Sequence, residues 1–499
     1  MELNVSSVGQ IYKNNMNREK TALLFKDDVI SYAALDDKVI AYTNFLKSKG
    51  VHPGDKVILN TINSPEFLYT YLGTVRNGAI IVPINPMFTL EEMRFIASDS
   101  DAEYMIIHEG IMLKQGLSEE ILSKELGIKV FVLNETLFSE IEAAPREDYD
   151  LSRDTEEIST FLYTSGTTGQ PKAAMLSHGN LLNNARQCTI GIGSKPEDIF
   201  MCVLPMFHVF AFTACQLMPL FLGATADIVE TFAPKIVINN LIERDITIFM
   251  GVPAMYMVLI EAGKKDIKFP KLRLAISGGA ALPVEVYHQA KNSINLPIIE
   301  GYGLTEASPG SAFNPYDGVQ KPGSIGLPLI DIDAKIAGPD DKELPVGEVG
   351  ELLLRGPNVM KGYYKRPEDT AEAIKDGWLH TGDLAKFDDE GYIFIVDRKK
   401  DMIIVSGLNV YPREVEEVLY KHPKIKDAAV IGVDDKLRGE SVVAYVVLKE
   451  GETAQHREIL RWLETQLAAY KLPRRIVVMD DLPRNSTGKI LKRALKEKA

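Results

Sequence analysis

The chain has 499 residues, a formal net charge of −13 and 45% hydrophobic residues, as an ordinary globular protein has. That length predicts about three core-sized units, and the acidic balance argues against nucleic acid as the main partner. Cys188, Cys202 and Cys215 lack the spacing of a metal site or a disulfide framework. Residues 1–10 lack the basic and apolar runs of a signal peptide, so we expect a cytoplasmic protein.

Helix-like and strand-like patterns alternate through residues 20–160. We expect helices at 33–49 and 65–77, and strands at 56–60 and 79–83. The alternation returns between 247 and 304, with strands at 273–277 and 298–300 around a helix at 283–293. Such alternation is typical of α/β domains with mainly parallel sheets.

The segment YTSGTTGQPK at 163–172 carries the most specific local chemistry. Four hydroxyls, two glycines that permit positive φ and one ammonium can together bind a polyphosphate; they belong to Thr164, Ser165, Thr167, Thr168, Gly166, Gly169 and Lys172. The spacing is not that of a Walker loop, and the flanks 159–163 and 173–176 are strand-like. We therefore expect the segment to join two strands; a plain surface turn is the alternative.

Residues 200–226 contain no Asp, Glu, Lys or Arg, which is long enough to span a bilayer. Pro205, His208, Pro219 and Gly223 interrupt this run, so we expect buried core. It also suits the wall of an apolar ligand tunnel. His208 is then either an ordinary core histidine or part of that wall.

Two further segments follow predicted strands, where open α/β sheets bind their ligands. Ser277-Gly-Gly-Ala-Ala281 would let a flat base or an acyl chain pass close to the backbone. In the second, EGYGLTE at 300–306, Tyr302 can stack on a purine, Thr305 can donate to a phosphate and Glu306 can bind Mg²⁺. Glycine-rich turns without a ligand are the alternative for both.

After residue 323 the pattern changes to short alternating strands, which predicts a small antiparallel unit that includes 351–355. Asp383, in HTGD, can accept the two ribose hydroxyls or be a turn aspartate. A domain boundary is expected near 397–401. Beyond it we expect a compact unit with helices at 412–421 and 455–469, strands at 427–433 and 441–448, and a basic last helix.

The last motif, NSTGK at 485–489, is a second small-residue loop that ends in a lysine, Lys489; a helix N-cap is the alternative. Taken together, YTSGTTGQPK, GYGLTE, HTGD, DRKKDMIIVSG, NVYPREVE and NSTGK resemble, in this order, the signature of the adenylate-forming (AMP-binding) superfamily. LPMFHVF, SGGAALP and GPNVMKGYYKRPEDT look most like bacterial long- and medium-chain fatty-acid–CoA ligases.

The resemblance implies an α/β fold with a large N-terminal adenylation domain, residues 1–398, built from two α/β sheets and a small β-barrel-like unit. A small mobile α+β domain, residues 399–499, would follow. The implied reaction is ATP-dependent activation of a carboxylic acid to acyl-AMP and pyrophosphate, followed by transfer to CoA and release of AMP. The implied partners are the acid (a fatty acid), ATP, CoA and Mg²⁺, without nucleic acid. Transient contact with a membrane surface and a homodimer stay open.

The resemblance also implies roles for individual residues. ATP would be bound by Thr164–Gly169, Lys172, Gly278, Gly279, Ala280, Glu300, Gly301, Tyr302, Gly303, Leu304, Thr305, Asp383, Arg398 and Lys489. Mg²⁺ would be held by Glu306 and Thr164, and the residues that act in catalysis would be Lys489, Thr305, Glu306 and the hinge residue Lys400. The acyl tunnel would include His208, Phe210, Tyr256, Gly278, Ala280 and Gly303, and CoA would pass Ser406 and Gly407.

Three other functions fit the same sequence. An aryl- or other acid–CoA ligase and an acyl-AMP ligase that loads a carrier protein stay within the same chemistry. The apolar run at 200–226 favours an aliphatic acid. A nucleotide-binding regulator without catalysis belongs to another class, and intact Glu306, Asp383 and Lys489 argue against it.

Overall fold

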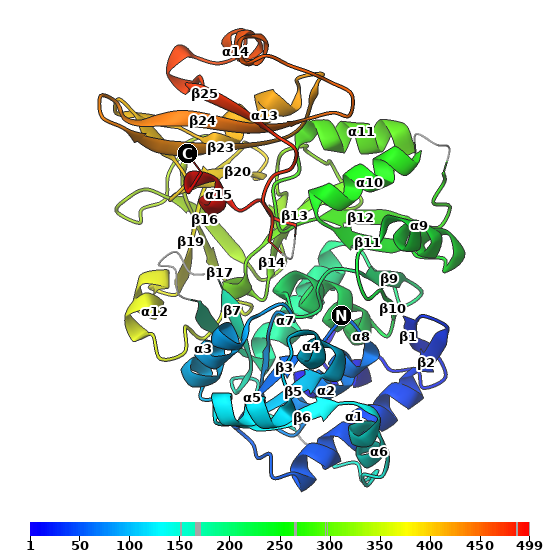
Figure 1. The fold of residues 1–499 in the computed structure, drawn as a ribbon. Helices are drawn as coiled ribbons and strands as arrows, with labels where there is room; N and C mark the ends of the chain where they lie inside the picture. Colours follow the sequence, from blue (N-terminus) through cyan, green and yellow to red (C-terminus); the bar gives the residue numbers. More distant parts are fainter. Residues whose placement is uncertain are drawn as a thin grey trace.

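The computed structural model describes residues 1–149, 152–164, 171–263, 267–294, 296, 298–485 and 488–498. Within these ranges the strands form four sheets, and helices cover the faces of the larger ones (Figure 1). The predicted fold class is confirmed: two α/β sheets, a small antiparallel sheet and a C-terminal α+β unit.

The largest described sheet has nine strands, in the order β15 (Leu327–Pro328), β14 (Gly310–Phe313), β13 (Ile298–Gly303), β12 (Leu274–Ser277), β11 (Ile248–Gly251), β9 (Ile199–Cys202), β10 (Thr225–Ile228), β1 (Thr21–Phe25) and β2 (Asp28–Ser31). The strands from β13 to β1 run parallel, and the two edges are antiparallel. β11 and β12 are buried throughout, as strands covered on both faces must be.

A second described sheet has six strands, in the order β6 (Lys129–Leu133), β5 (Tyr104–His108), β3 (Lys56–Asn60), β4 (Ile80–Pro83), β7 (Ile158–Thr164) and β8 (Lys172–Ser177). All neighbours are parallel except β7 and β8, which pair antiparallel with Thr164 opposite Lys172. The prediction that residues 163–172 join two strands is thus confirmed. Residues 165–170 themselves lie outside the described part of the chain.

The helices of this N-terminal part are η1 (Val8–Lys13), α1 (Tyr32–Ser48), α2 (Pro65–Arg76), α3 (Leu90–Ser100), α4 (Glu109–Lys114), α5 (Glu119–Leu126), α6 (Glu135–Glu142), α7 (His178–Gly191), η2 (Ala211–Leu217), α8 (Met218–Leu222), α9 (Pro234–Glu243), α10 (Pro253–Gly263), α11 (Val284–Ile294) and η3 (Thr305–Ala307). Local sequence sets their ends: α2 begins with a proline, and Thr89 and Glu92 form a capping box at the start of α3.

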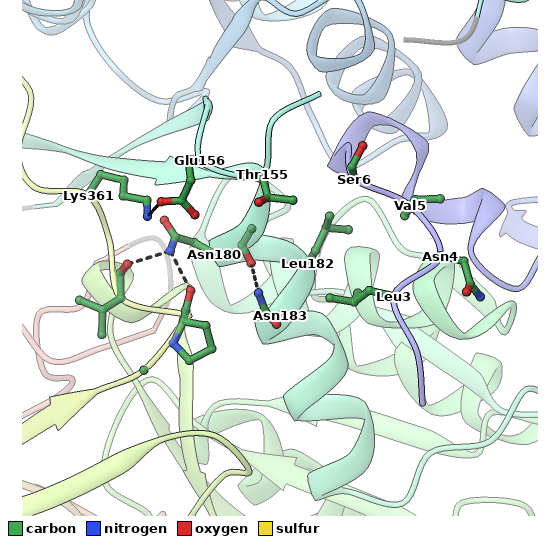
Figure 2. Close-up of a pocket in the computed structure, with 14 residues that line it drawn as sticks. Leu3, Asn4, Val5, Ser6, Thr155, Glu156, Asn180, Leu182, Asn183 and Lys361 are labelled. Atoms are coloured by element: carbon green, nitrogen blue, oxygen red, sulfur yellow. Dashed lines mark hydrogen bonds and ion pairs between the residues drawn. The ribbon is translucent and has the colours of Figure 1, made fainter. Parts of the chain in front are cut away.

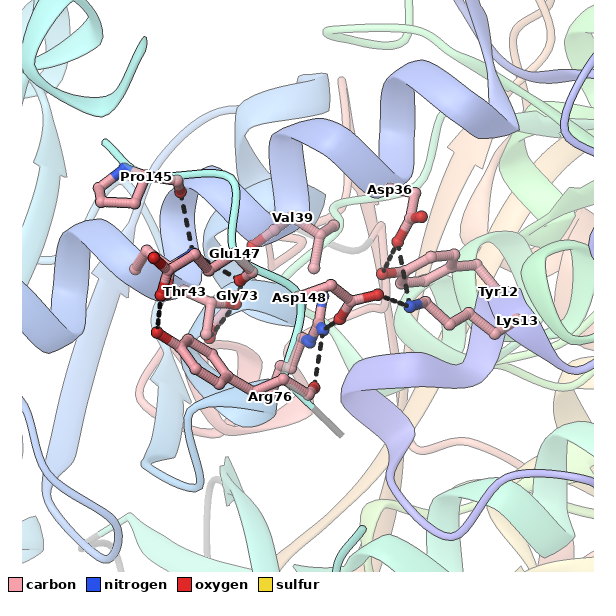
Figure 3. A network of polar contacts seen from close by, with 12 residues as sticks. Tyr12, Lys13, Asp36, Val39, Thr43, Gly73, Arg76, Pro145, Glu147 and Asp148 are labelled. Carbon is pink, nitrogen blue, oxygen red and sulfur yellow. Dashed lines mark hydrogen bonds and ion pairs between the residues drawn. The ribbon is translucent and has the colours of Figure 1, made fainter. Parts of the chain in front are cut away.

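A polar network joins the first helices to the segment that follows α6 (Figure 3). The Tyr12 hydroxyl donates to Asp36 at 2.9 Å, and Lys13 bridges Asp36 at 3.4 Å and Asp148 at 3.0 Å. Arg76, whose side chain is 1% exposed, forms an ion pair with Asp148. A charge buried to this degree needs such a partner, so the network fixes η1, α1 and α2 against one another.

The apolar run at 200–226 is core, as predicted. It forms β9, the π-helix η2, α8 and β10, and nearly all of its apolar side chains are buried. Across the described residues, no helix combines the length and the apolarity needed to cross a membrane. The π-helix begins three residues after His208, and such wide turns often occur at functional sites.

The third sheet is antiparallel and contains β16 (Asp333–Ala337), β17 (Gly350–Arg355), β19 (Trp378–Phe387), β18 (Ile374–Lys375) and β20 (Ile393–Arg398), with α12 (Pro367–Ala373) beside it. The fourth contains β22 (Leu408–Val410), β21 (Ile403–Val405), β24 (Gly439–Leu448), β23 (Ile425–Asp435) and β25 (Arg475–Met479). Its helices are α13 (Pro412–Tyr420), α14 (His456–Glu464), η4 (Ala469–Lys471) and α15 (Lys492–Lys496).

The change from the third sheet to the fourth falls between Arg398, the end of β20, and Ile403, the start of β21. The predicted helix at 455–469 is shorter, because α14 ends at Glu464 and only the short η4 follows it. In Figure 1 the red C-terminal segment leaves the fourth sheet and reaches down beside β13. This path brings the last motif of the sequence to the largest sheet.

Candidate active site

Three neighbouring parallel strands end at one edge of the nine-stranded sheet: β11, β12 and β13. Val252 follows β11, the glycines of SGGAA follow β12, and the glycines of EGYGLTE lie in the last residues of β13. Because the carboxyl ends of parallel strands share an edge, the structure brings these two predicted segments together.

The glycines here allow close backbone approach. A Cβ atom on Gly303 would lie 2.2 Å from the carbonyl oxygen of Pro309, and one on Gly278 would lie 3.1 Å from the Phe210 ring. Gly279 has φ +76°, which L-residues with side chains rarely adopt. A side chain at position 303 would clash with backbone and one at position 279 would be strained, while one at position 278 would crowd the Phe210 ring.

Tyr302 and Asp383 meet across two sheets. The Tyr302 hydroxyl donates to an Asp383 carboxylate oxygen at 2.5 Å, and Arg398 Nε lies 3.0 Å from the other oxygen. Asp383 on β19 and Arg398 on β20 are register partners. The predicted base-stacking residue and the two predicted ribose residues thus form one connected group.

In the six-stranded sheet, Thr164 ends β7 and Lys172 begins the neighbouring strand β8. The Lys172 ammonium forms an ion pair with Asp369 on α12 and lies 5.5 Å from the centre of the Tyr363 ring. Of the predicted phosphate residues, Ser165, Gly166, Thr167, Thr168 and Gly169 lie outside the described residues. Lys172 is thus held by protein groups beside the predicted phosphate segment.

Glu306 lies in η3, directly after Thr305. One of its carboxylate oxygens accepts a hydrogen bond of 2.7 Å from the Tyr363 hydroxyl. Carboxylate and hydroxyl oxygens suit Mg²⁺, which binds proteins through one or two carboxylates together with substrate phosphates. The described residues contain no cluster of three or more His, Cys, Asp or Glu side chains that could hold a metal ion by themselves. Glu306 and Thr164 therefore fit Mg²⁺ as a partner of bound phosphates.

Lys489 comes from the far end of the sequence to this edge of the sheet. A Cβ on its neighbour Gly488 would lie 3.2 Å from Val252, just after β11. Desolvation, and then the positive charge of Arg398, lower the pKa of the Lys489 ammonium to about 8. The negative charge of Asp383 acts in the opposite direction and raises this pKa. Lys489 therefore lies close enough to both predicted ribose residues to interact with their charges.

His208 and Phe210 precede η2, and His208 lies within the electrostatic reach of Lys489. Burial, and then the charge of Lys489, lower the pKa of the His208 imidazole to about 4, so this histidine is neutral at pH 7. Phe210 is half-buried against Gly278. Tyr256 is fully buried, and its hydroxyl donates to the carbonyl oxygen of Ile276 at 2.6 Å. Its contacts are those of a core residue beneath the strand ends.

The predicted hinge and CoA residues lie on the other unit. Lys400 is exposed in the turn between β20 and β21. Ser406 and Gly407 form the two-residue turn of the β21–β22 hairpin with φ +51° and +83°, as a type I′ turn requires. Both are exposed, and among the described residues no atom beyond the chain neighbours of Gly407 lies within 4 Å of a Cβ built on it. In this arrangement Lys489 is at the site and the Gly407 turn faces solvent.

Glu300 is 6% exposed at the end of β13. One carboxylate oxygen accepts the Leu282 N–H at 3.0 Å, and Arg413 of α13 is 3.9 Å away. The other oxygen has no hydrogen-bond partner within the described structure. Burial raises the pKa of this carboxyl group to about 7, which the Arg413 charge only partly offsets.

A cavity of about 650 Å³ is separate from these residues (Figure 2). It is lined by residues near the N-terminus, the start of α7 and the segment 356–361. Asn180 of α7 donates to the carbonyl oxygens of Pro357 and Val359, at 2.8 Å each. The Met360 N–H in turn donates to the Glu306 carbonyl at 2.9 Å. The segment that lines part of the cavity is thus also hydrogen-bonded to the backbone of Glu306.

The sequence-based prediction missed Tyr363 and Asp369, which contact Glu306 and Lys172. Both belong to GPNVMKGYYKRPEDT, which was noted only for its resemblance to fatty-acid–CoA ligases. A tyrosine and an aspartate near the start of a short helix carry no local sign of partners that lie 57 and 197 residues earlier in the chain.

Comparison with known proteins agrees with this geometry. The sequence profile of the family described as AMP-binding enzyme matches residues 12–364, and that of the AMP-binding enzyme C-terminal domain matches residues 414–489. A feruloyl-CoA synthase from Amycolatopsis is 36% identical over 97% of this chain and 96% of its own length. A long-chain-fatty-acid–CoA ligase from Bacillus subtilis is 34% identical over 96% of this chain and 92% of its own length.

Among solved structures, ATP-bound MatB from Rhodopseudomonas palustris superposes with a TM-score of 0.93 at 32% identity, covering 99% of each chain. The apo form of that protein gives 0.83 at the same identity and coverage. The arrangement of the present chain is therefore nearer to that of the ATP-bound form.

The fold and these matches define an acid–CoA ligase of the AMP-forming type, which uses ATP, CoA and Mg²⁺. The chain belongs to the AMP-binding enzyme family. Its partners are a small carboxylic acid and these two cosubstrates.

Proposed function

We propose that this protein is a long- or medium-chain fatty-acid–CoA ligase whose adenylation step takes place at the ends of β11, β12 and β13. The observation that carries the chemistry is the convergence of Lys489, Asp383 and Arg398 at one edge of the sheet. In the first step an oxygen of the acid carboxylate bonds to the α-phosphorus of ATP, and the bond to pyrophosphate breaks. A carboxylate is already ionised at pH 7, so no general base is needed.

In this proposal Asp383 and Arg398 hold the ribose, and Tyr302, Gly278 to Ala280 and Gly303 frame the base. Lys172 and Thr164 bind the outer phosphates, Thr305 donates to the α-phosphate, and Glu306 with Thr164 would hold Mg²⁺, which supplies neutralising charge to the phosphates. With a pKa near 8, Lys489 remains mostly protonated at pH 7 and can stabilise the charge that grows on the phosphate oxygens.

In the second step the CoA sulfur bonds to the acyl carbon, the thiol loses its proton, and AMP leaves. Ser406 and Gly407 would line the path of CoA only after the C-terminal unit, residues 399–499, has turned about Lys400. Their exposure here supports this order, since the present arrangement is nearer to an ATP-bound relative. One active site can then present different groups to the two steps.

The aliphatic substrate is supported by the uncharged and largely buried run of residues 200–226 and by the neutral His208 near Phe210. An aromatic acid is the second candidate, because the feruloyl-CoA synthase shares 36% identity with this chain. The test is kcat/KM for fatty acids from about C4 to C18, in steps that each change affinity only a few-fold, beside ferulate and benzoate. We expect a broad optimum among the fatty acids; a higher kcat/KM for either aromatic acid would replace the fatty-acid proposal by the second one.

A further inference from the structure

Tyr363 lies between the two charged groups that face the phosphates. Its hydroxyl donates to the Glu306 carboxylate at 2.7 Å, and its ring lies beneath the Lys172 ammonium at 5.5 Å. A phenol is protonated at neutral pH, so this hydroxyl donates to the carboxylate.

The segment that carries Tyr363 is itself fixed. The N–H groups of Lys361 and Tyr364 donate to Met175 and Ala173 of β8 at 2.9 Å each, and the Met175 N–H donates to Gly362 at 2.9 Å. The Tyr363 N–H donates to the Thr370 hydroxyl at 2.8 Å. The ring therefore has little freedom to move away from Lys172 and Glu306.

Lys172 and Glu306 carry opposite charges, so a direct ion pair between them would compete with a ligand for both groups. Asp369 already binds the Lys172 ammonium, and Tyr363 occupies one oxygen of Glu306. The second oxygen of Glu306 is then oriented by a fixed hydrogen bond. In many metalloproteins, a group that does not touch the metal ion orients a metal-binding carboxylate by such a hydrogen bond.

We propose that Tyr363 is a positioning residue that orients the Glu306 carboxylate for Mg²⁺ and keeps it apart from Lys172. This inference rests on the proposed function, in which Glu306 binds the ion. In this role Tyr363 acts through Glu306, which its hydroxyl contacts. A hydrogen bond to a charged group is strong enough for its loss to weaken Mg²⁺ binding roughly tenfold.

The test is Tyr363→Phe, with Tyr364→Phe as the matched control. The Tyr364 hydroxyl also donates to a carboxylate, Asp101, at 2.8 Å, but on the protein surface. Two measurements are made while Mg²⁺ is varied: ATP–pyrophosphate exchange with acid present, and the rise in unfolding temperature caused by ATP without acid. The second reports binding alone.

For Tyr363→Phe we expect the half-maximal Mg²⁺ concentration to rise roughly tenfold in both measurements, with kcat at saturating Mg²⁺ nearly unchanged. Tyr364→Phe should stay close to the parent protein. Equal Mg²⁺ curves for the two variants, while Glu306→Gln loses its Mg²⁺ response, would overturn the role of Tyr363 and leave the role of Glu306 intact. An unchanged Mg²⁺ response in Glu306→Gln would overturn both.

Discussion

Replacing Glu300 by glutamine removes a buried charge and keeps the shape of the side chain. Its carboxyl group has a pKa of about 7 in the folded protein against 4.5 ordinarily. The folded state therefore binds this proton more tightly than the unfolded state does. The contribution of this one group to the free energy of unfolding is most favourable below pH 4.5. It falls as the pH rises from 4.5 towards 7, and it is constant above that.

The gap between these two pKa values corresponds to about 3 kcal/mol at pH 8 and about 1 kcal/mol at pH 5.5. The amide oxygen of glutamine can still accept the Leu282 N–H, so Glu300→Gln should gain most of this free energy. We expect its unfolding temperature to exceed that of the parent by several degrees at pH 8 and by about a third of that amount at pH 5.5, because 1 kcal/mol shifts the unfolding temperature of a 150–250-residue protein by roughly 2–4 °C, and that of a longer chain by less.

The assay is thermal unfolding followed by circular dichroism at both pH values. Glu348→Gln is the control, because Glu348 is exposed and its replacement changes no buried charge. The reasoning about burial would be refuted if Glu300→Gln were less stable than the parent at pH 8, or if its advantage did not grow with pH.

Three further outcomes are expected. Lys489→Ala should lose about 10²–10³ in the rate of pyrophosphate exchange and keep acyl transfer from preformed adenylate; equal losses would contradict its placement in the first step alone. Because a pKa near 8 belongs to free Lys489, kcat/KM for ATP should fall as the pH rises through about 8, and Lys489→Arg should move this decline to higher pH; an unmoved decline would assign it to another group. Lys400→Pro should spare adenylation and slow thioester formation, and matching losses in separate assays of the two steps would remove the hinge role.

Much of the local structure was predictable from the sequence. The strand at 56–60 agrees with β3 at both ends, and the helix at 65–77 with α2 to one residue. Apolar periodicity, proline and capping residues act within a few positions, so such elements can be found without knowing their neighbours. The order of the six motifs likewise indicated the chemistry.

The assembly of the site was decided only by the tertiary structure. β1 pairs with β10, about 200 residues away, although its own pattern did not show to which sheet it belongs. The Tyr363–Glu306 hydrogen bond, the Lys172–Asp369 ion pair and the approach of Gly488 to Val252 also join distant segments. The periodicity of a segment indicates which of its side chains are buried and which are exposed. The residues that a side chain contacts depend on how whole sheets pack together, and local periodicity contains no information on that packing.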